Sequence, residues 1–233
     1  SAVLNRGLEG IISSDGLRSV SSFDSSLALP VTPIISVPFM PIPLRASLIN
    51  QAGAALRADG TPMMATYWDE GDGIPQYQLI WRDQLGWQKR RISRFKTRFS
   101  LEGAGTLPLP HSRPVIAVAP DGVVYCLSRS VEFGGALCLF VGHPPAYDFS
   151  RVEPIRLVGS DLGYYEPVID RGAWEQSGDL VLYVQYCSQD VGDKPTATRS
   201  AEAQLLKWSR ARLDKAVKPP ASRRFFNLLI GHR

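Results

Sequence analysis

Three side chains that can bind anions or move protons mark the ends of two apolar runs in the stretch HSRPVIAVAPDGVVYCLSR: His111, Arg113 and Arg129. An arginine guanidinium is planar, stays charged and binds a carboxylate through two parallel hydrogen bonds. A histidine titrates near neutral pH and can act as a base when it lines a cavity. The pattern predicts either a site for a ligand that carries carboxylates or charged side chains that pair with acids of a neighbouring element. A lone histidine is also common in an ordinary loop.

A second pair of candidates lies upstream of this stretch. Tyr77, in PQYQLIW, begins an apolar run after a glycine-rich loop, and Arg94, in RISRFKTRF, follows one predicted hairpin later. If both side chains point into one cavity, a phenol and a guanidinium lie within reach of a single ligand. The alternatives are that Tyr77 packs inside a sheet and that Arg94 is a solvated member of a basic cluster. That cluster comprises Lys89, Arg90, Arg91, Arg94, Lys96 and Arg98.

The elements that carry these residues are predicted to be β-strands. In three segments a polar turn is followed by a short run of strand-forming residues: 54–68, 115–129 and 173–186. Two of the turns are Asp-Gly, a strong hairpin signal. Asp59, Asp121 and Asp179 recur about every 60 residues, which suits a repeat of four strands. The sequence therefore predicts an all-β fold made of β-propeller blades, each of four antiparallel strands.

The predicted blades occupy residues 46–209, which at about 60 residues per blade make between two and three. Closed propellers have about four to eight blades, so we interpret the chain as part of a longer protein, with closure by oligomerisation as the alternative. Residues 1–45 are rich in proline and lack a period, and we expect a lead-in or partial blade there. QLLKW, residues 204–208, is predicted either as a closing strand or as the start of a helix.

The net charge of +4 is concentrated near the C-terminus. Between Lys207 and Arg233 there are eight Lys or Arg residues against one acid, Asp214, so residues 1–206 are slightly acidic. A basic surface on the body of the fold is not indicated, and we expect no nucleic-acid partner. Residues 210–233 are expected to form a basic tail with few contacts, unless the apolar run FFNLLI docks on a blade edge.

Cofactors and membrane segments are not indicated. The three cysteines, Cys126, Cys138 and Cys187, lack CxxC spacing, which favours buried free thiols over a zinc site and leaves a disulfide between the first two as an alternative. The acidic loop DEGDG, residues 69–73, is predicted to be a solvated turn, with a structural divalent cation as the alternative. No run of about 18 apolar residues exists, so we expect no membrane span.

Four longer stretches together carry a family resemblance: TYWDEGDGIPQYQLIWRDQLGWQ, FSLEGAGTLPLPHSRPVIAV, VYCLSR and GYYEPVIDRGAWEQSGDLVLYVQ. Over roughly residues 30–209 the chain resembles the BNR-type β-propeller proteins that include the ulvan and rhamnose-glucuronate polysaccharide lyases. Members of that family are similar to a closed propeller of about seven blades, so the chain resembles its C-terminal half. The sequence lacks the S-x-D-x-G-x-x-W box that is typical of sialidases.

The resemblance implies β-elimination on a uronate-containing polysaccharide, and hence a secreted or periplasmic protein. Such chemistry needs a group that neutralises the uronate carboxylate, a base that removes the C5 proton and an acid that protonates the leaving oxygen. The catalytic candidates are Tyr77, Arg94 and His111. The candidates for binding the substrate are Arg113, Arg129, Tyr164 and Tyr165.

Several alternatives accompany this hypothesis. The resemblance also places Glu166, in YYEP, at the strand entry of the following blade, so Arg113 and Glu166 are expected to form a structural ion pair. Tyr164 and Tyr165 are expected either to stack on sugar rings or to fill the core. The alternative function is a non-catalytic carbohydrate-binding propeller, and a weaker one is a sialidase-like glycoside hydrolase.

Overall fold

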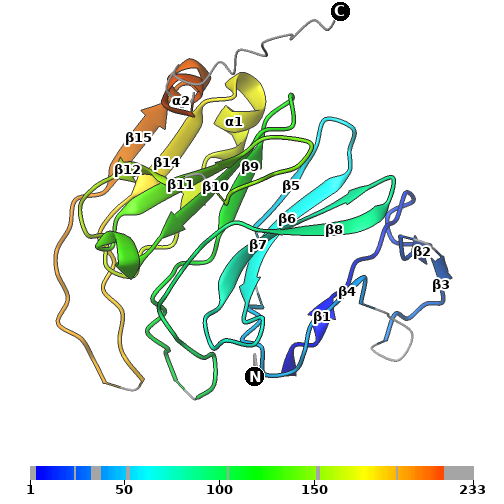
Figure 1. The fold of residues 1–233 in the computed structure, drawn as a ribbon, viewed down its shortest axis with the longest axis horizontal. Helices are drawn as coiled ribbons and strands as arrows, with labels where there is room; N and C mark the ends of the chain where they lie inside the picture. Colours follow the sequence, from blue (N-terminus) through cyan, green and yellow to red (C-terminus); the bar gives the residue numbers. More distant parts are fainter. Residues whose placement is uncertain are drawn as a thin grey trace, which may run out of the picture.

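Antiparallel β-sheets dominate the computed structural model of the chain (Figure 1). The structure describes residues 4–23, 25–32, 38–50, 53–103, 105–150, 153–192 and 194–217. Within them the helical elements are the short α1 (Arg171–Ser177), α2 (Arg210–Val217) and a 3-10 turn at Val131–Phe133. The expected all-β class is confirmed, and four-stranded sheets are present, but the described residues do not close into a ring.

Three sheets make up the body of the fold, and each follows the order of the sequence. Sheet I contains β5 (Gly53–Leu56), β6 (Pro62–Trp68), β7 (Gln76–Asp83) and β8 (Gly86–Arg91). Sheet II contains β9 (Val115–Val118), β10 (Val124–Arg129), β11 (Leu137–Gly142) and β12 (Ile155–Val158). Sheet III contains β13 (Val168–Ile169), β14 (Leu180–Val184) and β15 (Gln204–Trp208).

The predicted Asp-Gly turns lie at equivalent places in sheets I and II. Gly60 has a φ of 79° and its N–H donates to the carbonyl of Arg57 at 2.9 Å, between β5 and β6. Gly122 has a φ of 83° and donates to the carbonyl of Ala119 at 2.8 Å, between β9 and β10. These positive φ angles favour glycine, because it lacks a Cβ. The repeat read from the sequence is therefore confirmed for the first two sheets.

The third repeat differs, because helix α1 replaces the polar turn that the sequence predicted at 173–178. Asp170 caps the helix by accepting a hydrogen bond from the N–H of Ala173 at 3.0 Å, and Gly178 ends it with a φ of 71°. Trp174 is buried, and its indole N–H donates to the carbonyl of Val118 at 3.1 Å. Arg171 also donates to the carbonyl of Ile116 at 2.6 Å, so two side chains of the helix hold it against β9 of sheet II.

The sheets pack face to face around two cores. Residues of sheets I and II, among them Met63, Leu79, Ile116, Cys126 and Phe140, form the first core. Residues of sheets II and III, among them Tyr125, Leu127, Leu139, Leu180 and Leu182, form the second. Every residue of β10 and β11 is buried, since both faces of sheet II are covered. This arrangement explains why VYCLSR and LCLFVG show no alternation of polar and apolar residues.

The first strands of sheets I and II approach closely at one end. A Cβ on Gly53, which begins β5, would lie 2.5 Å from the carbonyl oxygen of Pro114, just before β9. The entries of these two strands are therefore adjacent, as are those of neighbouring blades in a propeller.

The N-terminal segment packs on the outer face of sheet I. It contains β1 (Gly7–Leu8), β2 (Val20–Ser21), β3 (Ser26–Leu27) and β4 (Met40–Pro41), with β1 paired to β4 and β2 to β3. The ring of Phe39 stacks on Trp87 at 3.9 Å, and Ile42 joins a cluster with Trp68 and Ile80 of sheet I. The described part of residues 1–45 is thus a partial layer that covers a sheet face.

The segment predicted to be a tail packs closely over its first part. QLLKW is the strand β15, and α2 follows it. Leu213 is buried in the second core, Arg210 pairs with Asp121 at 2.8 Å, and the hydroxyl of Tyr125 donates to Asp214 at 3.1 Å. The expectation of few contacts is therefore wrong for residues 210–217, and residues 218–233, with the run FFNLLI, lie outside the described residues.

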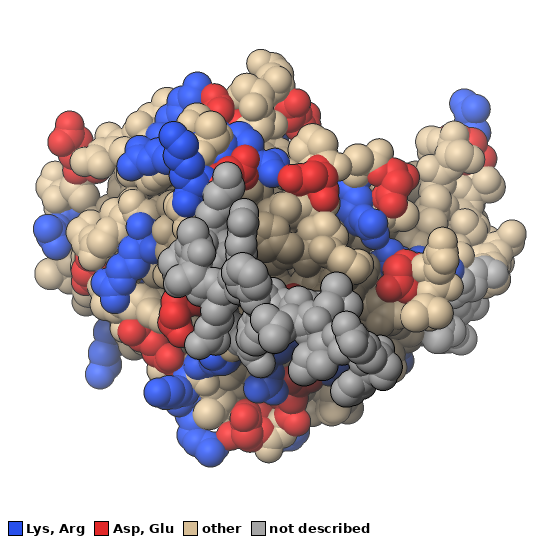
Figure 2. Space-filling model, turned by 45° about the horizontal axis from the view of Figure 1, so that its top comes forward, with Lys and Arg blue, Asp and Glu red and all other residues tan. Residues whose placement is uncertain are grey.

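All three cysteines are free, and Cys126 and Cys138 are buried, as the sequence favoured. On the face of the molecule shown in Figure 2, Lys and Arg side chains are interspersed with Asp and Glu side chains. The described helices are all too short to span a membrane.

Replacement of Leu213 by alanine tests the docking of α2. Because the side chain is buried, Leu213→Ala should lower the free energy of unfolding by about 2–5 kcal/mol. Urea denaturation gives this value, and Lys215→Ala, at an exposed position of the same helix, should change it by less than about 0.5 kcal/mol. Equal stability of the two variants would contradict the packing of α2 on the second core.

Candidate functional site

Tyr77 lies inside the first core, with no surface exposed to solvent. Its hydroxyl donates to the carbonyl of Ser112 at 2.6 Å and lies 2.8 Å from the hydroxyl oxygen of Ser128. Burial raises the pKa of the phenol well above its usual value. The side chain therefore joins sheet I to the start of sheet II and does not face a cavity, so the expected convergence of Tyr77 with Arg94 is not found.

Arg94 is exposed, just after β8. Its guanidinium donates to the carbonyl of Ser150 at 2.6 Å and to the carboxylate of Glu153 at 3.0 Å. Two hollows meet at this residue, with volumes of about 680 Å³ and 580 Å³, and Ile92 and Arg94 line both of them. We call the two hollows together the Arg94 groove.

The larger hollow has an apolar floor and a charged rim. Phe95, Phe133 and Phe140 line the floor. The rim carries two cations and two acids: Arg94, Lys96, Glu132 and Glu153. An aromatic floor with a few charged groups around it is typical of sites that bind small molecules or sugars.

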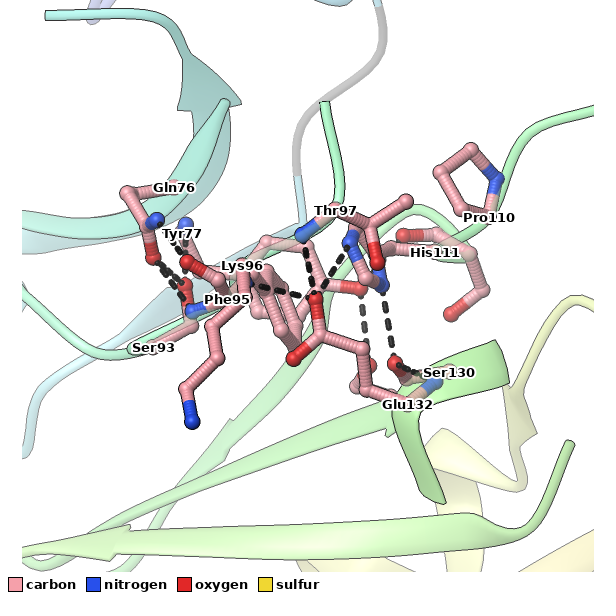
Figure 3. Close-up of polar contacts among 12 residues, drawn as sticks. Gln76, Tyr77, Ser93, Phe95, Lys96, Thr97, Pro110, His111, Ser130 and Glu132 are labelled. Atoms are coloured by element: carbon pink, nitrogen blue, oxygen red, sulfur yellow. Dashed lines mark hydrogen bonds and ion pairs between the residues drawn. The ribbon is translucent and has the colours of Figure 1, made fainter. Parts of the chain in front are cut away.

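The backbone of residues 93–97 is irregular, and side chains hold it in place (Figure 3). The amide of Gln76 donates to the carbonyl of Phe95 at 2.8 Å and accepts from its N–H at 2.9 Å. A carboxylate oxygen of Glu132 accepts from the N–H groups of Lys96 and Thr97, both at 2.7 Å. A buried glutamine and a glutamate of the neighbouring sheet thus replace the backbone ladder, and they fix the wall of the groove.

His111 lies beneath this wall and is fully buried. Its ring stacks on Phe95 with a centroid distance of 3.6 Å, and Nδ1 lies 2.8 Å from the hydroxyl oxygen of Ser130 (Figure 3). Burial lowers the pKa of His111 to about 4, although the carboxylate of Glu132, 3.8 Å from Nε2, opposes the shift. The ring is therefore neutral near pH 7 and faces no solvent, which contradicts the expectation of a base in an open cavity.

The other predicted residues gather where the three sheets begin. Arg113 contacts the carboxylate of Glu166 at 3.5 Å and donates its backbone N–H to the same group at 2.7 Å. The expected ion pair is confirmed, although the two side chains are 34% and 38% exposed and not buried.

Arg129 and Tyr165 serve the structure of this region. The guanidinium of Arg129 is buried and donates to the carbonyls of Leu109, Pro110 and Tyr165 at 3.0–3.4 Å. The hydroxyl of Tyr165 donates to the carbonyl of Tyr183, and burial raises the pKa of this phenol to about 12. Tyr164 is partly exposed, and its ring lies 5.8 Å from the guanidinium of Arg129. Of the predicted substrate-binding residues, Arg129 and Tyr165 are therefore not available to a ligand.

The acidic loop is held by contacts within the chain. The carboxylate of Asp69 accepts hydrogen bonds from three backbone N–H groups, those of Gly71, Asp72 and Gly73, at 2.8–3.0 Å. Glu70 forms ion pairs with Lys89 and Arg91. These contacts describe a capped turn in which both carboxylates already have partners.

Sequence reasoning missed several residues of the groove: Phe95, Glu132, Phe133, Phe140 and Glu153, and it named Lys96 only as a member of the basic cluster. One signal was present, since Ser130 caps the short turn and accepts from the N–H of Glu132 at 3.1 Å, as expected for Ser-x-Glu. No family model matches the sequence, and no curated protein matches it. The resemblance to BNR-type propeller lyases therefore rests on the quoted motifs, and function must be argued from the site.

The hydroxyl of Tyr77 is predicted to stabilise the fold. Tyr77→Phe leaves the buried carbonyl of Ser112 without this donor, so the free energy of unfolding should fall by about 1–3 kcal/mol. Tyr183→Phe, which removes an exposed hydroxyl bonded to Gln185 at 3.1 Å, is the matched control and should change it by less than about 0.5 kcal/mol. A variant Tyr77→Phe with unchanged stability in urea would show that the bond contributes nothing.

His111 should make the fold less stable in mild acid. The unfolded chain binds a proton at the usual pKa of 6.5, whereas the folded chain does so only near 4, so stability is lost as the pH falls through this window. Between pH 7 and pH 4 the wild-type protein should lose up to about 3 kcal/mol more than His111→Gln. The exposed His143, changed to Gln, is the control. Parallel pH profiles for wild type and His111→Gln would refute the assignment.

Proposed function

We propose that this chain binds an acidic polysaccharide along the Arg94 groove. The observation that carries the proposal is that two neighbouring hollows, of about 680 Å³ and 580 Å³, share Arg94 in their lining. A groove that runs past one cation suits an extended ligand that carries a carboxylate on successive units. The carboxylate of the ligand would compete with Glu153 for the Arg94 guanidinium, whose fork can bind a carboxylate bidentately.

The charges along the groove support this proposal. Arg90, Arg91, Arg94 and Lys96 follow one another on the chain from β8 into the wall, and an extended segment of this length spans roughly 20 Å. Arg91 is neutralised by Glu70. Arg90 and Lys96 are exposed and form no ion pair within the part of the chain that the structure describes. They flank Arg94 in the sequence, and the carboxylates of an acidic polysaccharide would neutralise them.

The apolar floor of the larger hollow favours a carbohydrate over a simple anion as the ligand. Phe133 is partly exposed at the floor of the larger hollow, and the rings of Phe95 and Phe140 lie beside it. The apolar face of a pyranose ring packs on such a surface, while its hydroxyls and carboxylate reach the rim.

Cleavage by β-elimination is the second candidate, and the position of Arg94 favours it. A guanidinium at the groove would neutralise the uronate carboxylate, which β-elimination requires, and the sequence placed Arg94 as the candidate for this role. Tyr77 and His111 are buried, so the proton transfers would fall to Lys96, Glu153 or Glu132. Burial opposes the ionisation of Glu132, but the bonds from Lys96 and Thr97 outweigh it and lower its pKa. Glu132 is therefore a carboxylate near neutral pH and fits a base better than an acid.

Binding of ulvan, with neutral dextran as the comparison, tests the proposal. Titration calorimetry at low ionic strength should detect binding of ulvan but not of dextran. Arg94→Ala should raise the dissociation constant for ulvan about tenfold. Arg212→Ala, an exposed arginine on α2, should bind like the wild type. Added salt should weaken the interaction, because exposed charges are screened.

The outcomes separate the two candidates. An increase in ultraviolet absorbance from an unsaturated uronate, lost in Arg94→Ala, would establish cleavage, while binding without this increase would establish a binding protein. Equal affinity for ulvan and dextran, or an unchanged affinity of Arg94→Ala, would overturn the proposal.

A further inference from the structure

Two hydrogen bonds cross the Arg94 groove between sheet I and sheet II. One Nη atom of Arg94 donates to the carbonyl of Ser150 at 2.6 Å, and the other donates to the carboxylate of Glu153 at 3.0 Å. Arg94 follows β8, the last strand of sheet I, whereas Ser150 and Glu153 lie between β11 and β12 of sheet II. The contacts therefore connect the two sides of the groove. We call the three residues the Arg94 bridge.

The bridge lies at the boundary between the two hollows. Ser150 lines the smaller hollow, Glu153 lines the larger one, and Arg94 lines both. A ligand confined to one hollow can leave the bridge intact. An extended ligand that occupies both hollows has to pass the guanidinium and its two partners.

Glu153 is the partner in the bridge that can leave. Its side chain is 87% exposed, and one of its oxygens accepts from one nitrogen of Arg94. An exposed ion pair of this kind contributes little to the stability of a fold. Because the next residue is Pro154, the backbone of Glu153 is restricted to the extended region, so the carboxylate would move away by rotation of the side chain.

The second acid of the larger hollow is fixed in its position. The side chain of Glu132 is 19% exposed, and its carboxylate accepts from the backbone N–H groups of Lys96 and Thr97, both at 2.7 Å. Movement of this carboxylate would leave the two N–H groups without their acceptor. Glu153 is therefore the acid whose place a ligand can take.

We propose that Glu153 is a gate residue of the Arg94 groove. In the free protein its carboxylate occupies the place on Arg94 that a carboxylate of the ligand takes in the complex, and the bridge closes the boundary between the hollows. The exchange of one carboxylate for the other opens the bridge and joins the hollows. A neutral chain offers no carboxylate for this exchange, so the gate favours acidic chains. The inference rests on the proposed binding of an acidic polysaccharide.

Calorimetric titration of Glu153→Gln with ulvan tests the gate. The dissociation constant should fall about threefold to fivefold relative to the wild type, because the ligand no longer has to break an ion pair. The position is exposed, so the melting temperature should stay close to that of the wild type. Glu202→Gln removes the same charge at an exposed position that does not line the groove, and it should bind ulvan like the wild type.

The double variant Arg94→Ala/Glu153→Gln separates the gate from simple charge repulsion. Without the guanidinium Glu153 has no partner to occupy, so its replacement in the Arg94→Ala protein should change the dissociation constant by less than about twofold. An equal gain in affinity in both backgrounds would show that Glu153 acts only by repelling the polyanion, and it would overturn the proposal.

The wild-type protein distinguishes failure of the gate from failure of the binding function. If the wild type and Glu153→Gln bind ulvan with the same affinity, the gate is refuted and the binding function stands. If Glu153→Gln binds ulvan and the wild type does not, the closed gate is supported. If neither protein binds ulvan, both proposals are refuted.

Discussion

The burial of both faces of sheet II is the constraint on which the rest of the structure depends. β10 and β11 have no exposed residue, so sheet II cannot exist without sheet I on one face and sheet III on the other. Burial of one large apolar side chain contributes about 1.5–3 kcal/mol, and both cores contain many. The three sheets therefore stabilise one another, and each connection between them must cross from one layer to the next.

These crossings explain where the candidate site lies. The segment between sheets I and II cannot continue either ladder, so its polar backbone groups need other partners. Gln76 and Glu132 supply them on the groove side, and Arg129 supplies them just before sheet II. Most of these side chains are occupied by structural bonds. Arg94 and Lys96 lie on the exposed side of this segment, and the proposed polysaccharide is placed there.

Local features of the fold could be predicted from the sequence. The Asp-Gly turns at Gly60 and Gly122 depend only on neighbouring residues and on the freedom of glycine at positive φ. Helix α1 was missed although its cap residues Asp170 and Gly178 are local signals, and its packing depends on Arg171 and Trp174, which bond to the distant sheet II.

The exposure of the site residues also depends on contacts distant in the sequence. Tyr77 and His111 were expected at cavities because they stand at strand ends, but packing against sheet II and Phe95 buries both. Burial by an adjacent layer is not revealed by the periodicity of a single strand. Arg113 with Glu166 was correctly paired, but from the family resemblance and not from the periodicity of the sequence.

The outer faces of sheets I and III differ in what covers them. The outer face of sheet I is covered by Phe39, Ile42 and their neighbours. On the outer face of sheet III, three cross-strand neighbours are exposed, Val168, Tyr183 and Leu205, at 54%, 45% and 72%. A row of apolar side chains across three strands is the surface that an inner layer of this fold buries, and no described sheet covers it. Within the described residues the stack of three sheets therefore ends at this exposed apolar row.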